Sequence, residues 1–585
     1  MSLGIAPSGV VTLSFGTFAN HVQAHYWNIQ DDAYGTASSD DGDMDWRVEY
    51  AEREGQGKES ASYVPRVVMF DLCGDAKVGS HRDEKESTRE AALATTSWGG
   101  RVEVCRASVA KRSAFAQALE RESRAVKAEA EAKAEKAALS VFDDEDEETG
   151  RRSKLGAVGR ALERGSASNG TNDASRSSSG QVLDSPEDIV RALVDGAGKL
   201  DEDADHWSDY LKVDVHERSV FKLTGKWSDI DAFSGFGEGL DWIDTEDRRE
   251  DVRESVRYWA EDCDTLGGFH IAVDDSSGFG GVCSRAMEDI KDDYNNAPIC
   301  VFSVKRPEDI ERKRIDMLNA AFMSTMLANN ADLFCPLAAC DTYPMMPGLR
   351  AQNWFHTSSV VALAMETITT PWRLKATTSS GTSTLGRLSL HDMARHMTNR
   401  APGSRVSAHM SNPVPPVASP ADAEILMKSL RGMTPNEIRR ACSDDDVDVD
   451  DRPFAESFVF RGIGSPDALD SSAIVEISDA AFSRELYRCP RHRCATRTPV
   501  SIPLPYPKLF DSNDPASVSS FTRLTSGASS ARALSIIESD ARRAAHSAVG
   551  KAVLRAWACD HTEFEETCET LRTHARAFAG LDDGE

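Results

Sequence analysis

The sequence predicts an α/β fold in which a parallel sheet carries helices on both faces. Two observations support this prediction: apolar runs at residues 10–15 and 66–70 have the composition of strands, and a helical pattern follows the first of them. Apolar runs without alternation are typical of parallel strands that are covered on both faces. Strands of this kind alternating with helices favour a layered α/β domain.

The first strand and helix form a β-turn-α unit. Residues 10–15 are β-branched or apolar, Gly16 ends the run, and Val22, Tyr26 and Ile29 then continue at helical spacing. A turn at a helix N-terminus gathers unpaired backbone N–H groups, which suit an anion. This unit is therefore a candidate phosphate site.

Composition excludes several classes of function. The chain has 585 residues with 40% hydrophobic content, enough for two or three packed subdomains. Its net charge of −28 opposes attraction to nucleic acid, and its twelve cysteines are too sparse for a disulfide scaffold, which favours reduced thiols in the cytosol.

No run approaches the roughly 18 apolar residues of a membrane span. Because no Lys or Arg precedes Arg47, a matrix presequence is also not expected. We expect no nucleic-acid partner, no transmembrane segment, and only peripheral membrane association.

Shifts in composition divide the chain. Residues 107–182 begin as an Ala/Glu/Lys/Arg-rich helix former and become Ser/Gly/Asn-rich, which predicts an inserted segment. Ser185-Pro186 marks the start of a helix where folded patterning resumes. In the C-terminal helices, Leu534, Ile537 and Ala541 share one face. The predicted parts are residues 1–106, 107–182, 183–345, 346–529 with an acidic loop at 443–452, and 530–585.

Three segments resemble tubulin in the expected order. Residues 63–72 look like the tubulin segment that ends its second core strand with an aspartate near the metal of the nucleotide, here Asp71. Residues 10–30 resemble its first strand, phosphate turn and helix, and residues 263–304 resemble the approach to its glycine loop with the helix and strand after it. Each match alone is short, but together they cover most of the N-terminal half outside the insertion.

Further segments are similar to misato proteins in particular, so the chain is identified as a member of the tubulin-like misato family. They include residues 207–211, 275–281, 334–337, 370–374 and 505–507. The resemblance implies a tubulin/FtsZ-like, Rossmann-type parallel sheet, a second α+β subdomain and C-terminal helices.

The resemblance also implies which residues would form a GTP pocket. They are Gly16, Asn20, Asp71, Gly278, Gly280, Gly281 and Asn319. However, residues 274–281 carry two aspartates and Phe279 where tubulins have glycines that curl around phosphates. Each carboxylate–phosphate repulsion is worth about 4 kcal/mol at roughly 4 Å and an effective dielectric of about 20. We expect a vestigial pocket that binds GTP or GDP weakly at most.

Catalysis is not expected, because no Gly-x-x-Asn-x-Asp segment lies between residues 341 and 356 to supply the acidic residues of tubulin-type hydrolysis. No catalytic residue and no metal site is predicted. Cys489, Cys494, Cys559, His561 and Cys568 lack the spacing of a zinc site. Residues 489–494 are instead expected to form a basic surface loop.

The function that the resemblance implies is non-enzymatic. It comprises mitochondrial distribution, morphology and inheritance of mitochondrial DNA through protein contacts, in the cytoplasm and peripherally at the mitochondrial outer membrane. Two alternatives stay open: a GTP-binding, polymer-forming protein, and a tubulin assembly factor that works with cytosolic chaperonin. Candidate partners are tubulin, chaperonin or prefoldin, and mitochondrial outer-membrane proteins.

Overall fold

The computed structural model of the chain describes residues 8–36, 43–54, 61–74, 112–125, 185–228, 231–307, 314–339, 346–375, 386–415, 422–433, 452–462, 471–482, 489–510 and 515–580. The chain divides into two compact units, residues 1–111 with 200–585, and residues 112–199. Most of the predicted insertion, and the acidic loop apart from Arg452, lie outside the described residues. The five-part division drawn from the sequence stays a prediction.

The predicted α/β fold is confirmed by a six-stranded sheet in the order β5-β4-β1-β6-β7-β8, in which every neighbouring pair is parallel. The strands are β1 (Gly9–Phe15), β4 (Val67–Cys73), β5 (Val220–Trp227), β6 (Leu266–Asp274), β7 (Ile299–Lys305) and β8 (Leu333–Ala338). All seven residues of β1 are buried, as the continuous apolar run predicted. Strand β4 continues two residues beyond Asp71, where the sequence suggested that it ends.

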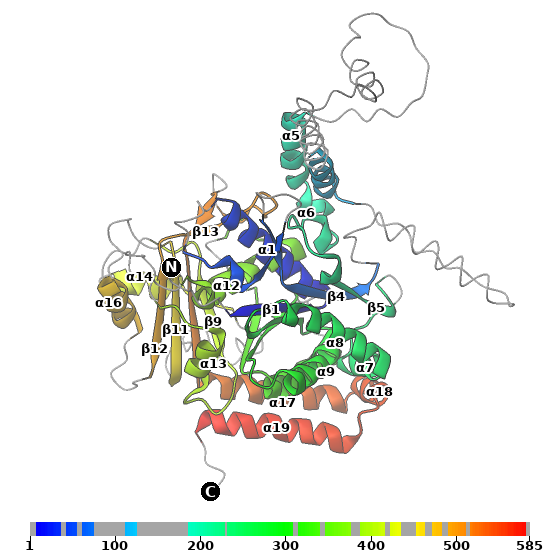
Figure 1. Cartoon of the computed structure of the whole chain (residues 1–585). Helices are drawn as coiled ribbons and strands as arrows, with labels where there is room; N and C mark the ends of the chain where they lie inside the picture. The colour runs from blue at the N-terminus through cyan, green and yellow to red at the C-terminus, as the bar shows by residue number, and fades with distance from the viewer. Residues whose placement is uncertain are drawn as a thin grey trace, which may run out of the picture. The chain divides into compact units, whose positions relative to one another are not determined.

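Helices cover both faces of this sheet (Figure 1). On one face α1 (Thr17–Thr36) packs against the long buried helix α12 (Trp354–Arg373). The other face carries α7 (Phe236–Ile243), α8 (Glu246–Glu261) and α9 (Phe279–Asp293). Val11, Leu13 and Phe15 of β1 share a hydrophobic core with the second group. Both faces of the central strands are therefore covered, as parallel strands require, whereas the edge strand β5 is partly exposed.

A second, mixed sheet has the order β10-β9-β15-β11-β12. Its strands are β9 (Ser407–Ser411), β10 (Arg431–Gly432), β11 (Pro453–Arg461), β12 (Arg491–Thr496) and β15 (Ser520–Gly527). The expected basic loop at residues 489–494 is wrong, because most of it is strand β12, in which Arg491 pairs with Glu456. Helix α12 contacts β11 and β15 as well as α1, so it links the two sheets.

The C-terminal helices are α17 (Ser529–His546), α18 (Ala548–Ala556) and α19 (His561–Ala579). Helices α17 and α19 lie side by side (Figure 1). The predicted apolar face is confirmed, because Leu534, Ile537 and Ala541 are buried. The C-terminal helices pack on α10 (Arg314–Phe322) and, through α19, on the π-helix η4 (Met323–Leu327).

The remaining elements are short or lie in the second unit. They are η1 (Trp46–Val48), β2 (Tyr50–Glu54), β3 (Ala61–Pro65), α5 (Pro186–Ala197), α6 (Leu200–Asp203), η2 (Trp207–Asp209), η3 (Glu217–Ser219), α11 (Ala328–Asn330), α13 (Leu390–Thr398), α14 (Ala423–Ser429), α16 (Ser471–Phe482), β13 (Val500–Ser501) and β14 (Ser517–Val518). The predicted start of α5 is confirmed, since Ser185 caps it by accepting a hydrogen bond from Asp188 N. Among the described helices, none is long and apolar enough to cross a membrane.

Candidate functional site

The candidate site lies where the parallel strands of the first sheet end, at the edge where ligands bind in open α/β sheets. Gly16 follows β1, Asp71 lies near the end of β4, and residues 275–278 follow β6. Gly16 has a φ of 105°, and a Cβ there would come within 2.9 Å of Asp274 Cβ. Glycine is therefore required at this turn. The structure brings the predicted residues to one edge, in two groups that meet at Gly16.

The first group surrounds Asp71, whose side chain is fully buried. Its carboxylate accepts hydrogen bonds from Thr17 Oγ1 at 3.0 Å, Asn20 Nδ2 at 3.1 Å and Trp207 Nε1 at 2.6 Å. The backbone N–H of Leu72 adds a fourth donor at 2.9 Å. Four protein donors satisfy both carboxylate oxygens, so a metal ion would have to displace one of them.

The second group is the loop between β6 and α9. Asp274 Oδ1 accepts a hydrogen bond from Ser276 N at 2.9 Å, and Asp275 N donates to Val304 O at 3.1 Å. Gly278 N donates to Phe233 O at 2.8 Å. Three backbone donors of this loop, on Asp275, Ser276 and Gly278, are thus already bonded within the chain.

Helix α9 begins at Phe279, so Gly280 and Gly281 lie inside the helix and not in a loop. A Cβ on Gly281 would come within 2.7 Å of Leu240 N in α7. A Cβ on Gly239 would likewise come within 2.8 Å of Gly278 C. These glycines let the backbones of α7 and α9 touch, which is a second physical reason for a glycine-rich segment.

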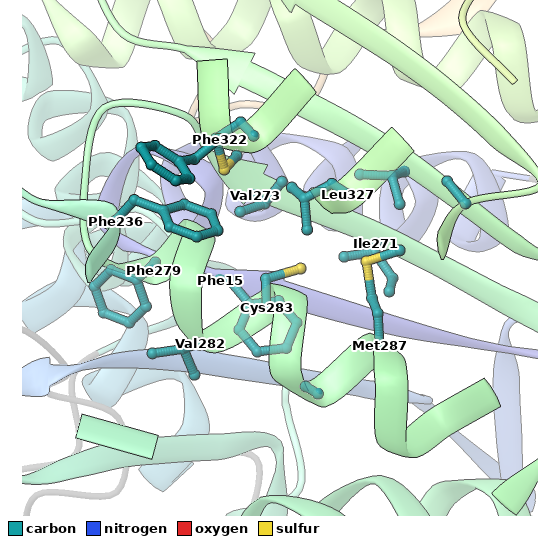
Figure 2. Packing of buried hydrophobic residues seen from close by; sticks show 14 of the residues in the cluster. Phe15, Phe236, Ile271, Val273, Phe279, Val282, Cys283, Met287, Phe322 and Leu327 are labelled. Carbon is teal, nitrogen blue, oxygen red and sulfur yellow. The ribbon is translucent and has the colours of Figure 1, made fainter. Parts of the chain in front are cut away.

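Asn319, the predicted base-reading residue, is fully buried in α10. Its Oδ1 accepts a hydrogen bond from Phe236 N at 2.9 Å, and its Nδ2 donates to Ser234 O at 2.8 Å. The Phe236 ring stacks on Phe322 with the ring centroids 5.5 Å apart and the planes at 21° (Figure 2). We name residues 233–239 the filler segment, because its backbone occupies both polar ends of the Asn319 amide.

Comparison with known proteins decides the family. The family model "Misato Segment II tubulin-like domain" matches residues 8–121, and the model "Tubulin domain" matches residues 199–374. Protein misato homolog 1 of Bos taurus is 25% identical, and that of Homo sapiens 24%, each over 98% of this chain and 98% of the relative. The chain belongs to the misato family. Protein dml1 of Aspergillus clavatus is also similar, at 22% identity over 65% of this chain and 64% of its own length.

The tubulin-like fold of this misato-family chain raises the question of whether its residues fit GTP with a metal. They do not fit, because each group that would hold the nucleotide is bonded elsewhere in the chain. The Asn319 amide holds the filler segment, three loop N–H groups have partners within the chain, and four protein donors satisfy Asp71. Phe279 is buried beside the turn at Gly16, where its ring would lie 3.0 Å from a Cβ on that glycine.

Sequence reasoning missed two parts of this misato-family site. The first is Trp207, which donates the shortest hydrogen bond to Asp71 from a position 136 residues away. The second is the filler segment. Its sequence offered one indication, because glycines stand at the alternate positions Gly235, Gly237 and Gly239, close to phenylalanines. Such a run facing a second glycine-rich segment indicates two backbones in contact.

Replacing Asn319 by Ala is expected to lower the free energy of unfolding by about 2–4 kcal/mol. The change leaves the buried N–H of Phe236 and the partly buried C=O of Ser234 without the amide; the buried loss costs about 1–3 kcal/mol and the partly buried one about 1 kcal/mol. Urea unfolding of the purified chain measures the effect. The exposed Asn329, ten residues along the chain, provides the matched control as Asn329→Ala. Equal stability of the two variants would contradict the role assigned to the Asn319 amide.

Proposed function

We propose that the protein acts in mitochondrial distribution, morphology and inheritance of mitochondrial DNA through contacts with other proteins, without hydrolysing GTP. Membership of the misato family supports the cellular role. One structural observation supports the absence of hydrolysis: the candidate base reader Asn319 bonds at both ends to the filler segment. The protein works as a folded scaffold whose internal site is filled by its own chain.

The proposed place of action is the cytoplasm, with peripheral association at the mitochondrial outer membrane. Outer-membrane proteins are the partners that this role requires. The tubulin-like fold offers a large folded surface for such contacts, and its integrity depends on internal packing instead of a bound nucleotide.

Calorimetry with the purified full chain tests the absence of nucleotide binding. Titration with GTP or GDP in the presence of Mg²⁺ is expected to give no saturable heat up to about 1 mM, a binding free energy weaker than about −4 kcal/mol. Phosphate release is expected to match a protein-free control. GTP turnover that Asp71→Ala abolishes would overturn this part of the proposal. Sedimentation of the chain only in the presence of GTP would instead support a polymer-forming protein.

A replacement experiment in cells tests the mitochondrial role. Cells depleted of their own misato protein and given this chain are expected to regain an evenly distributed mitochondrial network, and affinity purification is expected to recover outer-membrane proteins. Recovery of cytosolic chaperonin without any outer-membrane protein, together with unrescued mitochondria, would replace this proposal by that of a tubulin assembly factor.

A further inference from the structure

The filler segment is covered from outside by Trp557, which directly follows α18. A Cβ on Gly235 would come within 2.5 Å of Trp557 Nε1, and a Cβ on Gly237 within 2.8 Å of Trp557 Cδ1. The indole ring therefore packs directly against the backbone at Gly235 and Gly237, where no side chain intervenes. The contact joins the C-terminal helices to the segment that fills the candidate base site.

A second contact runs through aromatic rings. Trp557 meets Phe322 edge-on, with ring centroids 5.8 Å apart and planes at 77°, and Phe322 stacks on Phe236. Phe322 lies in α10, the helix that also carries Asn319. Trp557 thus touches the filler segment directly and also touches the helix that holds it.

The backbone at this contact is strained on both sides. Among the described residues, the two non-glycine residues with positive φ are Phe233, at 35°, and Ala558, at 54°. Phe233 begins the filler segment, and Ala558 directly follows Trp557. Side chains disfavour this conformation, and it persists only where surrounding contacts hold it. Phe233 is held by the Phe279 ring, 5.1 Å away between centroids, and by its bond to Gly278 N.

Helix α18 is the least anchored of the three C-terminal helices. In α18 only Gly550 is buried, whereas α17 and α19 each bury several side chains on one face. Elements with few buried contacts open at the lowest free-energy cost. Movement of α18 would remove Trp557 from the filler segment while α17 and α19 stay packed.

We propose that Trp557 is a latch through which the C-terminal helices keep the filler segment in the candidate base site. Displacing α18 releases residues 233–239, and with them the Asn319 amide. The latch concerns the closure of the site and does not depend on the mitochondrial role, so the two proposals fail independently.

Hydrogen–deuterium exchange of the full chain, followed by mass spectrometry, tests the latch. In Trp557→Ala, exchange in peptides that cover residues 233–240 is expected to be at least about tenfold faster, the change that about 1.4 kcal/mol of lost stabilisation produces. Val549, 58% exposed on the same helix, supplies the control as Val549→Ala, which is expected to leave this exchange unchanged. Unchanged exchange in Trp557→Ala, or an increase spread over the whole chain, would overturn the latch.

A compensating pair gives an independent test. Gly235 has a φ of −114°, which alanine accommodates, so Gly235→Ala disturbs the chain only through the clash of its Cβ with the indole ring. The single variant is expected to speed exchange in residues 233–240 and to lower the melting temperature by a few degrees. In the Trp557→Ala background the same change is expected to add no further loss. A fully additive double variant would show that the indole does not press on the filler segment.

Discussion

Replacing Glu366 by Gln is expected to lower the free energy of unfolding by about 3–5 kcal/mol, as removal of one partner from a buried ion pair does. Glu366 lies in α12 and is 2% exposed. Its carboxylate accepts hydrogen bonds from Arg461 Nη1 at 2.6 Å and Gln30 Nε2 at 2.6 Å, and it pairs with Arg373 Nη2 at 2.8 Å. A neutral amide would leave two buried guanidinium groups with one remaining carboxylate.

That remaining carboxylate is Glu49, also 2% exposed, at 3.9 Å from Arg373 Nε. Burial raises the pKa of Glu49, and Tyr26 donates a hydrogen bond to it at 2.8 Å. The network joins α1, α12 and β11, so it lies at the junction of the two sheets. A loss of about 3–5 kcal/mol is a large part of the roughly 5–15 kcal/mol that stabilises a folded protein.

Urea or thermal unfolding of the purified variant measures this effect. Glu424→Gln is the matched control, because Glu424 is exposed on α14, where it pairs with Lys428. The control is expected to unfold at the same urea concentration as the unmodified chain. If Glu366→Gln is as stable as the control, the buried network does not contribute to stability in the way that its geometry indicates.

Lowering the pH from 6.5 to 5 is expected to cost about 3 kcal/mol of stability through two buried histidines. Burial, helped by the nearby Arg373, lowers the pKa of His270 from 6.5 to about 3. Burial also lowers the pKa of His492 from 6.5 to about 4. Below pH 6.5 these histidines are protonated in the unfolded chain but stay neutral in the folded one. The free energy of unfolding that they contribute above pH 6.5 is therefore lost progressively as the pH falls. Each histidine accounts for about 1.6 kcal/mol over this range, because an unfolded histidine is already half protonated at pH 6.5.

The variant His270→Phe isolates one of these contributions. The ring of His270 lies between Tyr26 and Phe302, and neither of its nitrogens has a hydrogen-bond partner among the described residues. Between pH 6.5 and 5 the variant is expected to lose about 1.6 kcal/mol less than the unmodified chain. The exposed His391, replaced by Gln, is the control and is expected to leave the pH profile unchanged. Parallel profiles for His270→Phe and the unmodified chain would contradict the assignment.

The elements that sequence reasoning predicted correctly depend on local pattern. The strand at residues 10–15, the helix after it and the strand that carries Asp71 were readable because burial on both faces requires continuous apolar residues. The apolar face of α17 was readable for the same reason, since its period is that of a helix. The order of these units, with the resemblance to tubulin, was enough for the fold class.

The errors arose where one residue type serves two purposes. Glycines at 280 and 281 suit a phosphate loop and also suit a helix in close contact with its neighbours. Only the position of α9 distinguishes the two, since Gly281 meets the backbone of α7 and Gly280 meets Met323. The cationic run at residues 489–494 suggested a surface loop, whereas Glu456 and Asp479 offset its charges within the folded structure. In both cases the deciding partner is distant in the chain.

The sequence by itself therefore determined that this protein has a tubulin-like α/β fold and that Gly16, Asn20 and Asp71 come to one edge of its sheet. The strands, the helix after the first of them and their burial follow from patterns that each segment carries alone. Only the tertiary structure decided what those residues hold. Trp207 donates to Asp71, the filler segment bonds to Asn319, and Trp557 covers that segment. A hydrogen-bond donor or an aromatic ring that comes from a distant segment produces no recognisable pattern in the sequence around the site. Which part of the chain fills the site is therefore decided by tertiary packing.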